Sequence, residues 1–477
     1  MSLDNPTVMM GVLVGLAIAM LGLFRPFLGL LVLMTLHFVQ PGEMIPALAP
    51  FRIELIYGVL IFGILVFKKS AAIKKILLTD RIVLGALLLE ALVIFSIPFA
   101  LWPGGAAFVA QELLKMIMLQ LLMAFFIDSQ ERLRYILWLF VSFLMWFAGS
   151  SFSAYIHGEF YTVNGVQRAE GINSMVGGPN ELAGLLLALL PFLIALIHCS
   201  KNVLVKILLC GCGALTLFVF ALTGARISML ALIALAIFYV LRSKRKLLSL
   251  AAVIAVGCLL WLSLPQQYQS RYLTVKQYAA GGELDDSNKL RLQIWQAGGR
   301  MFLDHPLLGV GPGQFPTAFG TIYSGNVHGA WMEPHSLLLQ VTCELGLIGL
   351  GIFSYFVFQI WKAIRWVLQK SGSVPRMKIN YEFATACYLM MIGIALISLV
   401  SHTLYRPYWY LLAGLVSANY GIGHKVAKST LTNERSRGRE IGPQVRIPAG
   451  RRARHLRPQS KIYVKSKKGA GGYRQEL

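Results

Sequence analysis

Two neighbouring stretches of this 477-residue chain decide its fold class: residues 181–198 read ELAGLLLALLPFLIALIH and residues 203–222 read VLVKILLCGCGALTLFVFAL. Each suits a transmembrane helix, which needs about 20 mostly apolar residues to cross about 30 Å of hydrocarbon. Eleven further runs share this character: 8–24, 26–40, 51–67, 82–101, 110–127, 133–153, 226–241, 247–264, 336–361, 382–402 and 406–421. Because backbone polar groups must pair in lipid, we predict an all-α polytopic integral membrane protein with about 12–13 transmembrane helices.

The composition supports this class. The chain is 56% apolar and 14% charged, whereas soluble domains average about 25% charged residues. Its net charge is nevertheless +23, from 44 basic and 21 acidic residues. This combination excludes a soluble enzyme, a secreted disulfide scaffold and a disordered chain, and it makes nucleic acid an unsuitable partner. The six cysteines lie in or beside apolar runs without zinc-ligand spacing, so no metal site is predicted.

The basic residues indicate the orientation. They gather in alternate connections between the runs: Lys68, Lys69, Lys74, Lys75 and Arg81; Arg132 and Arg134; Lys201 and Lys206; Arg242, Lys244, Arg245 and Lys246; Lys362, Arg365, Lys370, Arg376 and Lys378. By the positive-inside rule this side faces the cytoplasm, together with the C-terminus. The first run lacks a cleavage site and is expected to be a first span rather than a signal peptide.

The loops divide the chain into five segments. We expect N-terminal helices over 1–153, central helices with an outward loop at 154–180 over 154–264, a large outward loop over 265–335, C-terminal helices over 336–421 and a basic tail over 422–477. The tail is poor in apolar residues and is expected to be disordered and cytoplasmic. It is interpreted as a solvated topology anchor, with binding to anionic lipid headgroups as an alternative.

The large outward loop carries an amphipathic pattern. Leu290, Ile294, Ala297 and Met301 recur at helical spacing, which predicts an amphipathic helix that ends at 305–306 (His-Pro). A glycine-rich turn follows at residues 309–313. This turn only reverses the chain direction, or it also offers backbone N–H groups to a phosphate. It is not a P-loop, because no Gly-Lys-Ser/Thr follows it.

His335 opens the run after this loop. Pro334 suits the first helical position, which would put His335 in the first turn at the outer end of a span. The positive end of a helix disfavours imidazolium, so His335 is expected to be neutral and able to act as a general base. An interfacial anchoring role is the alternative. Glu344 would lie about 13 Å deeper, as a buried structural carboxyl or as the floor of a site.

Several arginines are expected on the outward side, although most basic residues are expected on the cytoplasmic side. Arg226 follows a turn at the outer membrane edge, where a charge is a functional candidate or reaches to lipid headgroups. Arg168 lies in the outward loop, shortly before Asn180, which is expected to cap the next helix. Arg406, beside two tyrosines, is interpreted as an interfacial anchor.

Together these motifs resemble the O-antigen ligase/polymerase family of bacterial envelope glycosyltransferases, over roughly residues 165–360. The motifs that carry the resemblance are, in order, Thr223-Gly224-X-Arg226 ending a span, Arg291-X3-Trp295 in the outward loop, Asp304-His305-Pro306-Leu307-Leu308-Gly309-Val310-Gly311-X-Gly313-X-Phe315, and Pro334-His335-Ser336 opening the next span.

The resemblance implies a function. Family members transfer a glycan from undecaprenyl diphosphate to an acceptor hydroxyl at the periplasmic face of the inner membrane, without metal or other cofactor. The acceptor is the lipid A core in ligases, another glycan in polymerases and a protein in some relatives. His335 matches the family's proposed base, Arg226 and Arg291 match its diphosphate-binding arginines, and Arg168 and Arg300 are weaker candidates for the same anion.

We therefore expect an O-antigen ligase-like enzyme, with a polysaccharide polymerase as the first alternative. A lipid-linked sugar flippase is a further alternative. Transporters favour repeated halves and polar sites at mid-membrane depth, whereas this sequence has no evident repeat and its polar candidates lie at outer helix ends.

Overall fold

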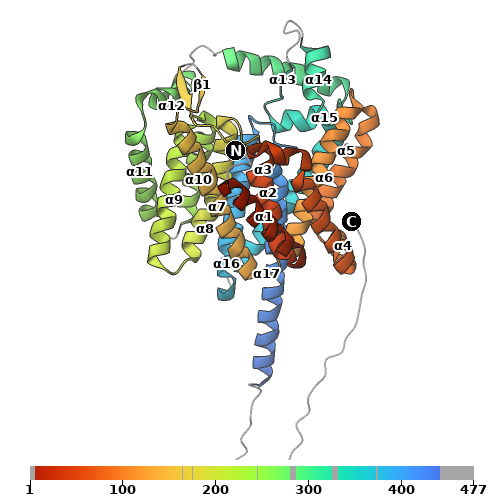
Figure 1. Cartoon of the computed structure of the whole chain (residues 1–477), viewed down its shortest axis with the longest axis vertical. Coiled ribbons are helices and arrows are strands. Elements are labelled where there is room, and N and C mark those ends of the chain that lie inside the picture. Colours follow the sequence, from red (N-terminus) through yellow and green to blue (C-terminus); the bar gives the residue numbers. More distant parts are fainter. Residues whose placement is uncertain are drawn as a thin grey trace, which may run out of the picture. The chain divides into compact units, whose positions relative to one another are not determined.

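The computed structural model describes residues 6–163, 165–174, 176–243, 245–279, 286–324, 331–371 and 374–440. The chain forms two compact units, Met1–Ser429 and Thr430–Leu477. The first unit is a helical bundle around one large apolar core (Figure 1). In the second unit, the described residues are the last ones of the final helix, 430–440. This helix continues beyond residue 421, where the last span is predicted to end, and the remainder of the predicted tail, 441–477, lies outside the described residues.

The bundle is built almost entirely of helices. The elements of the N-terminal half are α1 (Pro6–Phe24), α2 (Pro26–Val39), α3 (Pro41–Met44), η1 (Pro46–Phe51), α4 (Ile53–Thr79), α5 (Arg81–Ser96), η2 (Ile97–Phe99), α6 (Pro103–Phe126) and α7 (Gln130–Ile156). The remaining helices are α8 (Pro179–Cys199), α9 (Val203–Leu222), α10 (Arg226–Arg242), α11 (Lys246–Ser263), α12 (Gln266–Ala279), α13 (Asp286–Asp304), α14 (Phe315–Ala318), η3 (Phe319–Tyr323), α15 (Leu337–Ser371), η4 (Pro375–Met377), α16 (Lys378–Ser398) and α17 (Pro407–Glu440).

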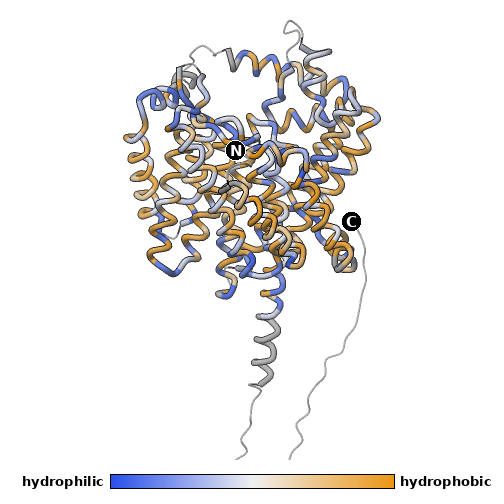
Figure 2. Tube along the Cα trace, in the orientation of Figure 1, coloured by the Kyte–Doolittle hydropathy of each residue, from blue (hydrophilic) through white to orange (hydrophobic). Residues whose placement is uncertain are grey.

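Each of the thirteen predicted apolar runs contains a helix, and the predicted all-α polytopic membrane fold is confirmed. Within the described ranges, nine helices are long and apolar enough to cross a membrane, and α1 and α2 are shorter apolar helices. In the first unit, apolar residues dominate the middle of the bundle and polar residues its two ends (Figure 2).

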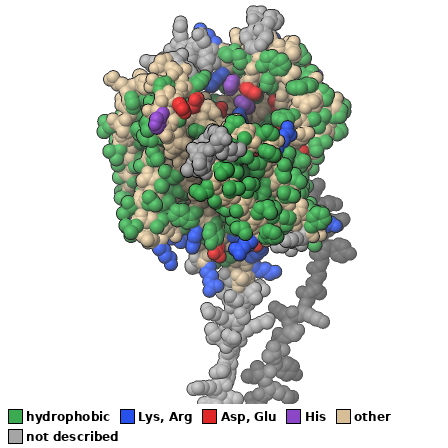
Figure 3. All heavy atoms as spheres, viewed as in Figure 1, with side chains coloured by type: hydrophobic (Ala, Val, Ile, Leu, Met, Phe, Trp, Pro, Cys, Tyr) green, Lys and Arg blue, Asp and Glu red, His purple; other side chains and the backbone are tan. Residues whose placement is uncertain are grey.

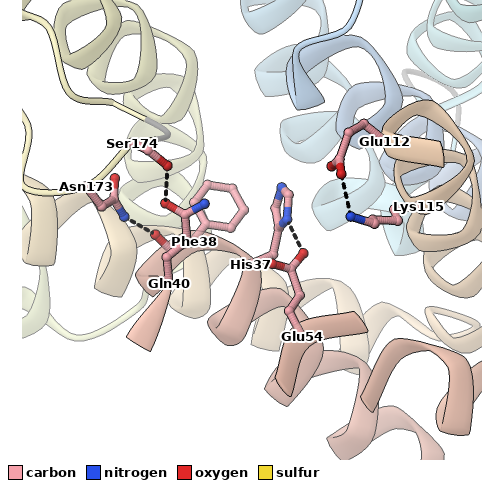
Figure 4. A network of polar contacts seen from close by, with 8 residues as sticks. All are labelled: His37, Phe38, Gln40, Glu54, Glu112, Lys115, Asn173 and Ser174. Carbon is pink, nitrogen blue, oxygen red and sulfur yellow. Dashed lines mark hydrogen bonds and ion pairs between the residues drawn. The ribbon is translucent and has the colours of Figure 1, made fainter. Parts of the chain in front are cut away.

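The loop after α7, which is predicted to face outward, contains a small hairpin that the sequence patterns did not indicate. Strands β1 (Tyr161–Val163) and β2 (Val166–Arg168) pair antiparallel. Beyond the hairpin, Asn173 donates to the Phe38 carbonyl oxygen at 2.9 Å, and the Ser174 N–H donates to Glu43 at 2.7 Å. These bonds join the loop to α2 and α3, beside a His37–Glu54 pair 2.7 Å apart (Figure 4).

Helix α13 confirms the amphipathic pattern. Ile294, Ala297 and Met301 are buried in a second apolar cluster, and the helix ends at Asp304, directly before the predicted His-Pro stop. In Figure 1, α13 lies at the upper end of the bundle with α14 and the start of α15. The Cys343 thiol donates to the Gly298 carbonyl oxygen at 3.1 Å, which fastens α13 to α15.

A kink at Gly346 (φ +65°) divides α15, and the glycine-rich turn docks into that kink. The Val310 N–H donates to the Cys343 carbonyl oxygen at 2.8 Å, and the Leu347 N–H donates to the Pro306 carbonyl oxygen at 2.9 Å. Gly309 (φ +69°) needs its glycine because a Cβ there would overlap the α15 backbone. The turn therefore replaces helical hydrogen bonds that the kink breaks.

The role of Glu344 follows from this docking. Its buried carboxyl accepts hydrogen bonds from the N–H groups of Gly313 at 2.9 Å and Phe315 at 3.3 Å. Glu344 is thus a structural carboxyl that anchors the turn, which settles the alternative left open by the sequence. Since the Gly313 N–H is bonded to Glu344, the turn does not hold that group out for a phosphate.

Candidate active site

A polar pocket of about 320 Å³ lies where the hairpin loop, α8, α10, α12, α13 and the segments preceding α15 and α17 meet. Figure 3 shows a hollow in the upper part of one face, with basic, acidic and histidine side chains near it. The polar residues that line the pocket include Arg168, Asn180, Glu181, Arg226, Arg271, Arg291, His335, His402, Arg406 and Tyr408. Four of the five predicted site residues, Arg168, Arg226, Arg291 and His335, are therefore brought together.

Two of the arginines bind the end of α9. Arg168 donates through Nε to the Thr223 carbonyl oxygen at 2.6 Å, and Arg271 donates through Nε to the Gly224 carbonyl oxygen at 3.0 Å. Guanidinium groups are favourable there because the last carbonyls of a helix carry partial negative charge. Gly224 (φ +59°) makes the turn that leads directly into Arg226, the first residue of α10.

Asn180 does not cap α8, contrary to the sequence-based expectation. The helix begins at Pro179, its N-cap is Gly178, and that cap makes no side-chain hydrogen bond. The Asn180 side chain instead accepts a hydrogen bond from Arg168 at 2.9 Å. The helix therefore starts two residues earlier than expected, with the proline at its first position, so Asn180 falls inside the first turn, facing the pocket.

The arginines make the pocket strongly basic. Burial, followed by repulsion from Arg271 and Arg226, lowers the pKa of Arg168 to about 10. Arg168 therefore remains a cation at neutral pH. Such a concentration of guanidinium groups attracts a polyvalent anion, since each can donate paired hydrogen bonds to phosphate oxygens.

Arg291 and Arg300 lie on the same helix but in different surroundings. Arg291, on α13, is half-buried and lines the pocket, whereas Arg300 is exposed and does not. Nine residues separate them, about 13 Å along a helix. The structure therefore brings Arg291 but not Arg300 to the other predicted site residues.

His335 precedes α15 rather than lying in its first turn. The helix begins at Leu337, so the expectation that Pro334 starts it is wrong. His335 has φ +47°, a left-handed conformation that is costly for a residue with a Cβ and often accompanies a functional constraint. Burial, followed by the positive charge of Arg291, lowers the pKa of His335, while Glu181 opposes the shift. The shift favours the neutral imidazole, and burial rather than the helix end is its main cause.

The sequence reasoning missed three basic or histidine side chains of the pocket. Arg271 had no signal beyond its outward position, and Arg406 was read as an interfacial anchor. His402, in the connection between α16 and α17, lies with its ring centroid 6.2 Å from that of His335. Its position at the outward end of a span was the available signal.

Two apolar grooves flank the polar pocket. The first apolar groove, about 860 Å³, runs between α8, α10 and α11 and is roofed by α12. Arg226 lines both this groove and the polar pocket. The second apolar groove, about 1270 Å³, lies between α13, α15 and α16 and includes Ser336, the neighbour of His335. An amphiphile with an anionic head would fit the pocket and the first groove together.

Part of the chain is similar to known proteins. Residues 211–354 match the family described as O-antigen ligase. Proteins named "Putative polysaccharide ligase" from Rickettsia prowazekii and Rickettsia typhi are each 27% identical over 157 residues, which is 32% of this chain and 34% of theirs. A third, from Rickettsia felis, is 27% identical over 166 residues, 34% of this chain and 37% of its own.

The matched segments span about a third of the length of these curated relatives. The family match contains Arg226, Arg291, the glycine-rich turn and His335, and it leaves Arg168, His402 and Arg406 outside.

Proposed function

From the match of residues 211–354 to the O-antigen ligase family, we propose that this chain is a member of that family and transfers a glycan from undecaprenyl diphosphate to an acceptor hydroxyl. The acceptor would be the lipid A core, another glycan or a protein. The observation that carries the proposal is the position of Arg226, which lines both the basic pocket and the first apolar groove. A lipid-linked diphosphate has this combination of an anionic head and a long apolar tail.

The donor would lie across this boundary. Its polyprenyl tail would occupy the first apolar groove, which is lined almost wholly by apolar side chains of α8, α10 and α11. Its diphosphate would lie at Arg226 and Arg291, with Arg168 as a further cation. Arg168 also positions the end of α9 through Thr223, so it supports Arg226 as well as adding charge.

The chemistry would be a direct displacement. Neutral His335 accepts the proton of the acceptor hydroxyl, and the hydroxyl oxygen forms a bond to the anomeric carbon of the glycan. The bond from that carbon to the diphosphate oxygen breaks, and undecaprenyl diphosphate leaves with the electron pair. Guanidinium groups stabilise the negative charge that develops on the leaving group. One displacement inverts the anomeric centre, and the step as written uses neither metal nor cofactor.

We also propose the membrane orientation. Figure 3 shows Lys and Arg side chains at the end of the bundle opposite the hollow. By the positive-inside rule, that end faces the cytoplasm and the polar pocket faces the periplasm of the inner membrane, with a cytoplasmic C-terminus. This side is where lipid-linked glycan and envelope acceptors would meet.

Transfer by the purified protein tests the proposal. Protein in lipid nanodiscs would receive undecaprenyl-diphosphate-linked glycan and lipid A core, with and without EDTA. We expect transfer in both conditions and a loss of at least a hundredfold in His335→Ala, with no loss in the control His157→Ala, which lies outside the pocket. Unchanged transfer by His335→Ala would refute the assigned base. A glycan that lengthens on the lipid carrier itself would instead identify a polymerase.

A further inference from the structure

The connection between α16 and α17 holds a second histidine against the polar pocket in a fixed position. Thr403 bonds to Ser398 at 2.6 Å and accepts from the Trp409 indole at 3.2 Å. The next residue, Leu404, donates its N–H to the Gln340 side chain at 3.0 Å. These bonds tie the residues after His402 to α15, α16 and α17, so the backbone that carries this imidazole is pre-organised.

The imidazole of His402 has an unused polar atom. Its Nδ1 is buried and has no hydrogen-bond partner among the residues that the structure describes. Its Nε2 lies 3.7 Å from a Glu333 carboxylate oxygen, which is longer than a hydrogen bond. A buried polar atom without a partner costs free energy, and a substrate group that pairs with it removes that cost.

The two histidines can serve one substrate. Their ring centroids are 6.2 Å apart and their planes are inclined by 68°, with both residues lining the same pocket. A single hydroxyl can reach two nitrogen atoms up to roughly 5.5–6 Å apart, because each hydrogen bond spans about 2.9 Å. Burial, followed by Arg406 and His335, lowers the pKa of His402 to about 4, so the ring is neutral and both donates and accepts.

We propose that His402 binds the acceptor: its Nδ1 hydrogen-bonds to the acceptor beside the hydroxyl that His335 deprotonates. This inference rests on the proposed glycan transfer. It assigns the arginines and the histidine pair of the pocket to different substrates. The arginines of α10 and α13 receive the diphosphate of the donor, and the histidine pair receives the acceptor.

Three variants test the assignment. His402→Leu removes the polar atoms, His402→Asn keeps a hydrogen-bonding group near the position of Nδ1, and His157→Leu is a histidine control outside the pocket. Each purified protein would be assayed with undecaprenyl-diphosphate-linked glycan as donor and with membranes of a deletion strain as the source of acceptor. Binding of undecaprenyl diphosphate would be measured separately, and detergent melting curves would verify folding, with His402→Ala replacing His402→Leu if the latter does not fold.

We expect His402→Leu to need at least tenfold more acceptor membrane for half-maximal transfer, while its affinity for undecaprenyl diphosphate stays within twofold of wild type. His402→Asn should recover to within threefold of wild type. An unchanged acceptor requirement in His402→Leu, no recovery in His402→Asn, or a parallel loss of diphosphate binding would each overturn the proposal. If the wild-type protein neither binds undecaprenyl diphosphate nor transfers glycan, the proposed function itself fails, and this inference fails with it.

Discussion

The Glu344 side chain accepts a hydrogen bond from the Gly313 N–H at 2.9 Å, across 31 positions of the chain. This bond links the glycine-rich turn that follows α13 to α15, the helix that follows His335, and we call this link the joint. Because α13 carries Arg291, the joint fixes the proposed diphosphate-binding arginine relative to the proposed base. Glu344 itself lines neither the pocket nor the grooves.

Replacement of Glu344 should loosen this joint. Glu344→Ala leaves the buried Phe315 N–H and the part-buried Gly313 N–H unpaired, and a buried unpaired group costs about 1–3 kcal/mol. We expect a lower melting temperature in detergent, with a smaller decrease in Glu344→Gln, whose amide oxygen still accepts. Glu112→Ala is the control, since Glu112 forms a half-exposed pair with Lys115, and such pairs contribute about 0–1 kcal/mol. Equal melting temperatures for Glu344→Ala and wild type would show that the joint is dispensable.

The glycine-rich turn should not tolerate a methyl group at Gly309. An alanine there would adopt a left-handed conformation at a cost of about 1–2 kcal/mol, and its Cβ would overlap the backbone of α15. We expect Gly309→Ala to reduce the yield of folded protein and the melting temperature. Gly299→Ala is the matched control, because a Cβ on this α13 glycine meets no atom within 4 Å. If both variants melt alike, the docked turn contributes nothing to stability.

Replacing an arginine that lines the pocket should weaken the binding of undecaprenyl diphosphate, whereas replacing Arg300, which does not line it, should not. Arg226→Ala and Arg291→Ala each remove a charge-assisted contact of about 1.5–3 kcal/mol, equivalent to a roughly 10- to 150-fold weaker affinity for undecaprenyl diphosphate. Arg300→Ala should bind as wild type, since Arg300 is exposed outside the pocket. Binding to protein in nanodiscs measures this, and a comparable loss in Arg300→Ala would place the diphosphate elsewhere.

Transfer should remain active at a lower pH than an ordinary histidine base allows. Burial and Arg291 lower the pKa of His335, so the neutral base persists below the ordinary value of about 6.5. We expect the acidic limb of the kcat/KM–pH profile, which reports the protein before substrate binds, to lie below that value. Arg291→Gln removes a repelling charge and should move the limb to higher pH, although burial keeps part of the shift.

The charged and titratable groups around His335 in the pocket include Glu181, which opposes the shift, and His402. Arg300→Gln is the control for Arg291→Gln and should leave the limb in place. An acidic limb at or above 6.5 in the wild-type protein would contradict a buried neutral base.

The helical architecture could be predicted because the composition of each apolar run by itself determines that it forms a helix in lipid. A run such as 203–222 has no alternative to a helix in lipid, and the face of α13 that contains Ile294 and Met301 shows its periodicity directly. Arg168, Arg226, Arg291 and His335 lie in one pocket, as their predicted position at the same end of the spans allows, whereas Arg300 lies outside it.

The local geometry could not be predicted, because it depends on contacts between distant segments. Asparagine is a common N-cap residue, but α8 already begins at Pro179, before Asn180. The Asn180 side chain accepts a hydrogen bond from Arg168 instead. Pro334 suits a helix start, yet the chain turns left-handed at His335 before α15 begins. The role of Glu344 depends on a turn more than 30 positions away, which no periodicity reveals.

The kink at Gly346 has a consequence for protein engineering. Carbonyl groups of residues 306 and 307 accept hydrogen bonds from residues 347 and 348, so part of the extramembrane loop completes the ladder of a membrane helix. Neither segment carries the full set of partners by itself. A chimera that exchanges this loop with a relative therefore has to transplant residues 306–348 as one cassette, with its junctions outside those limits.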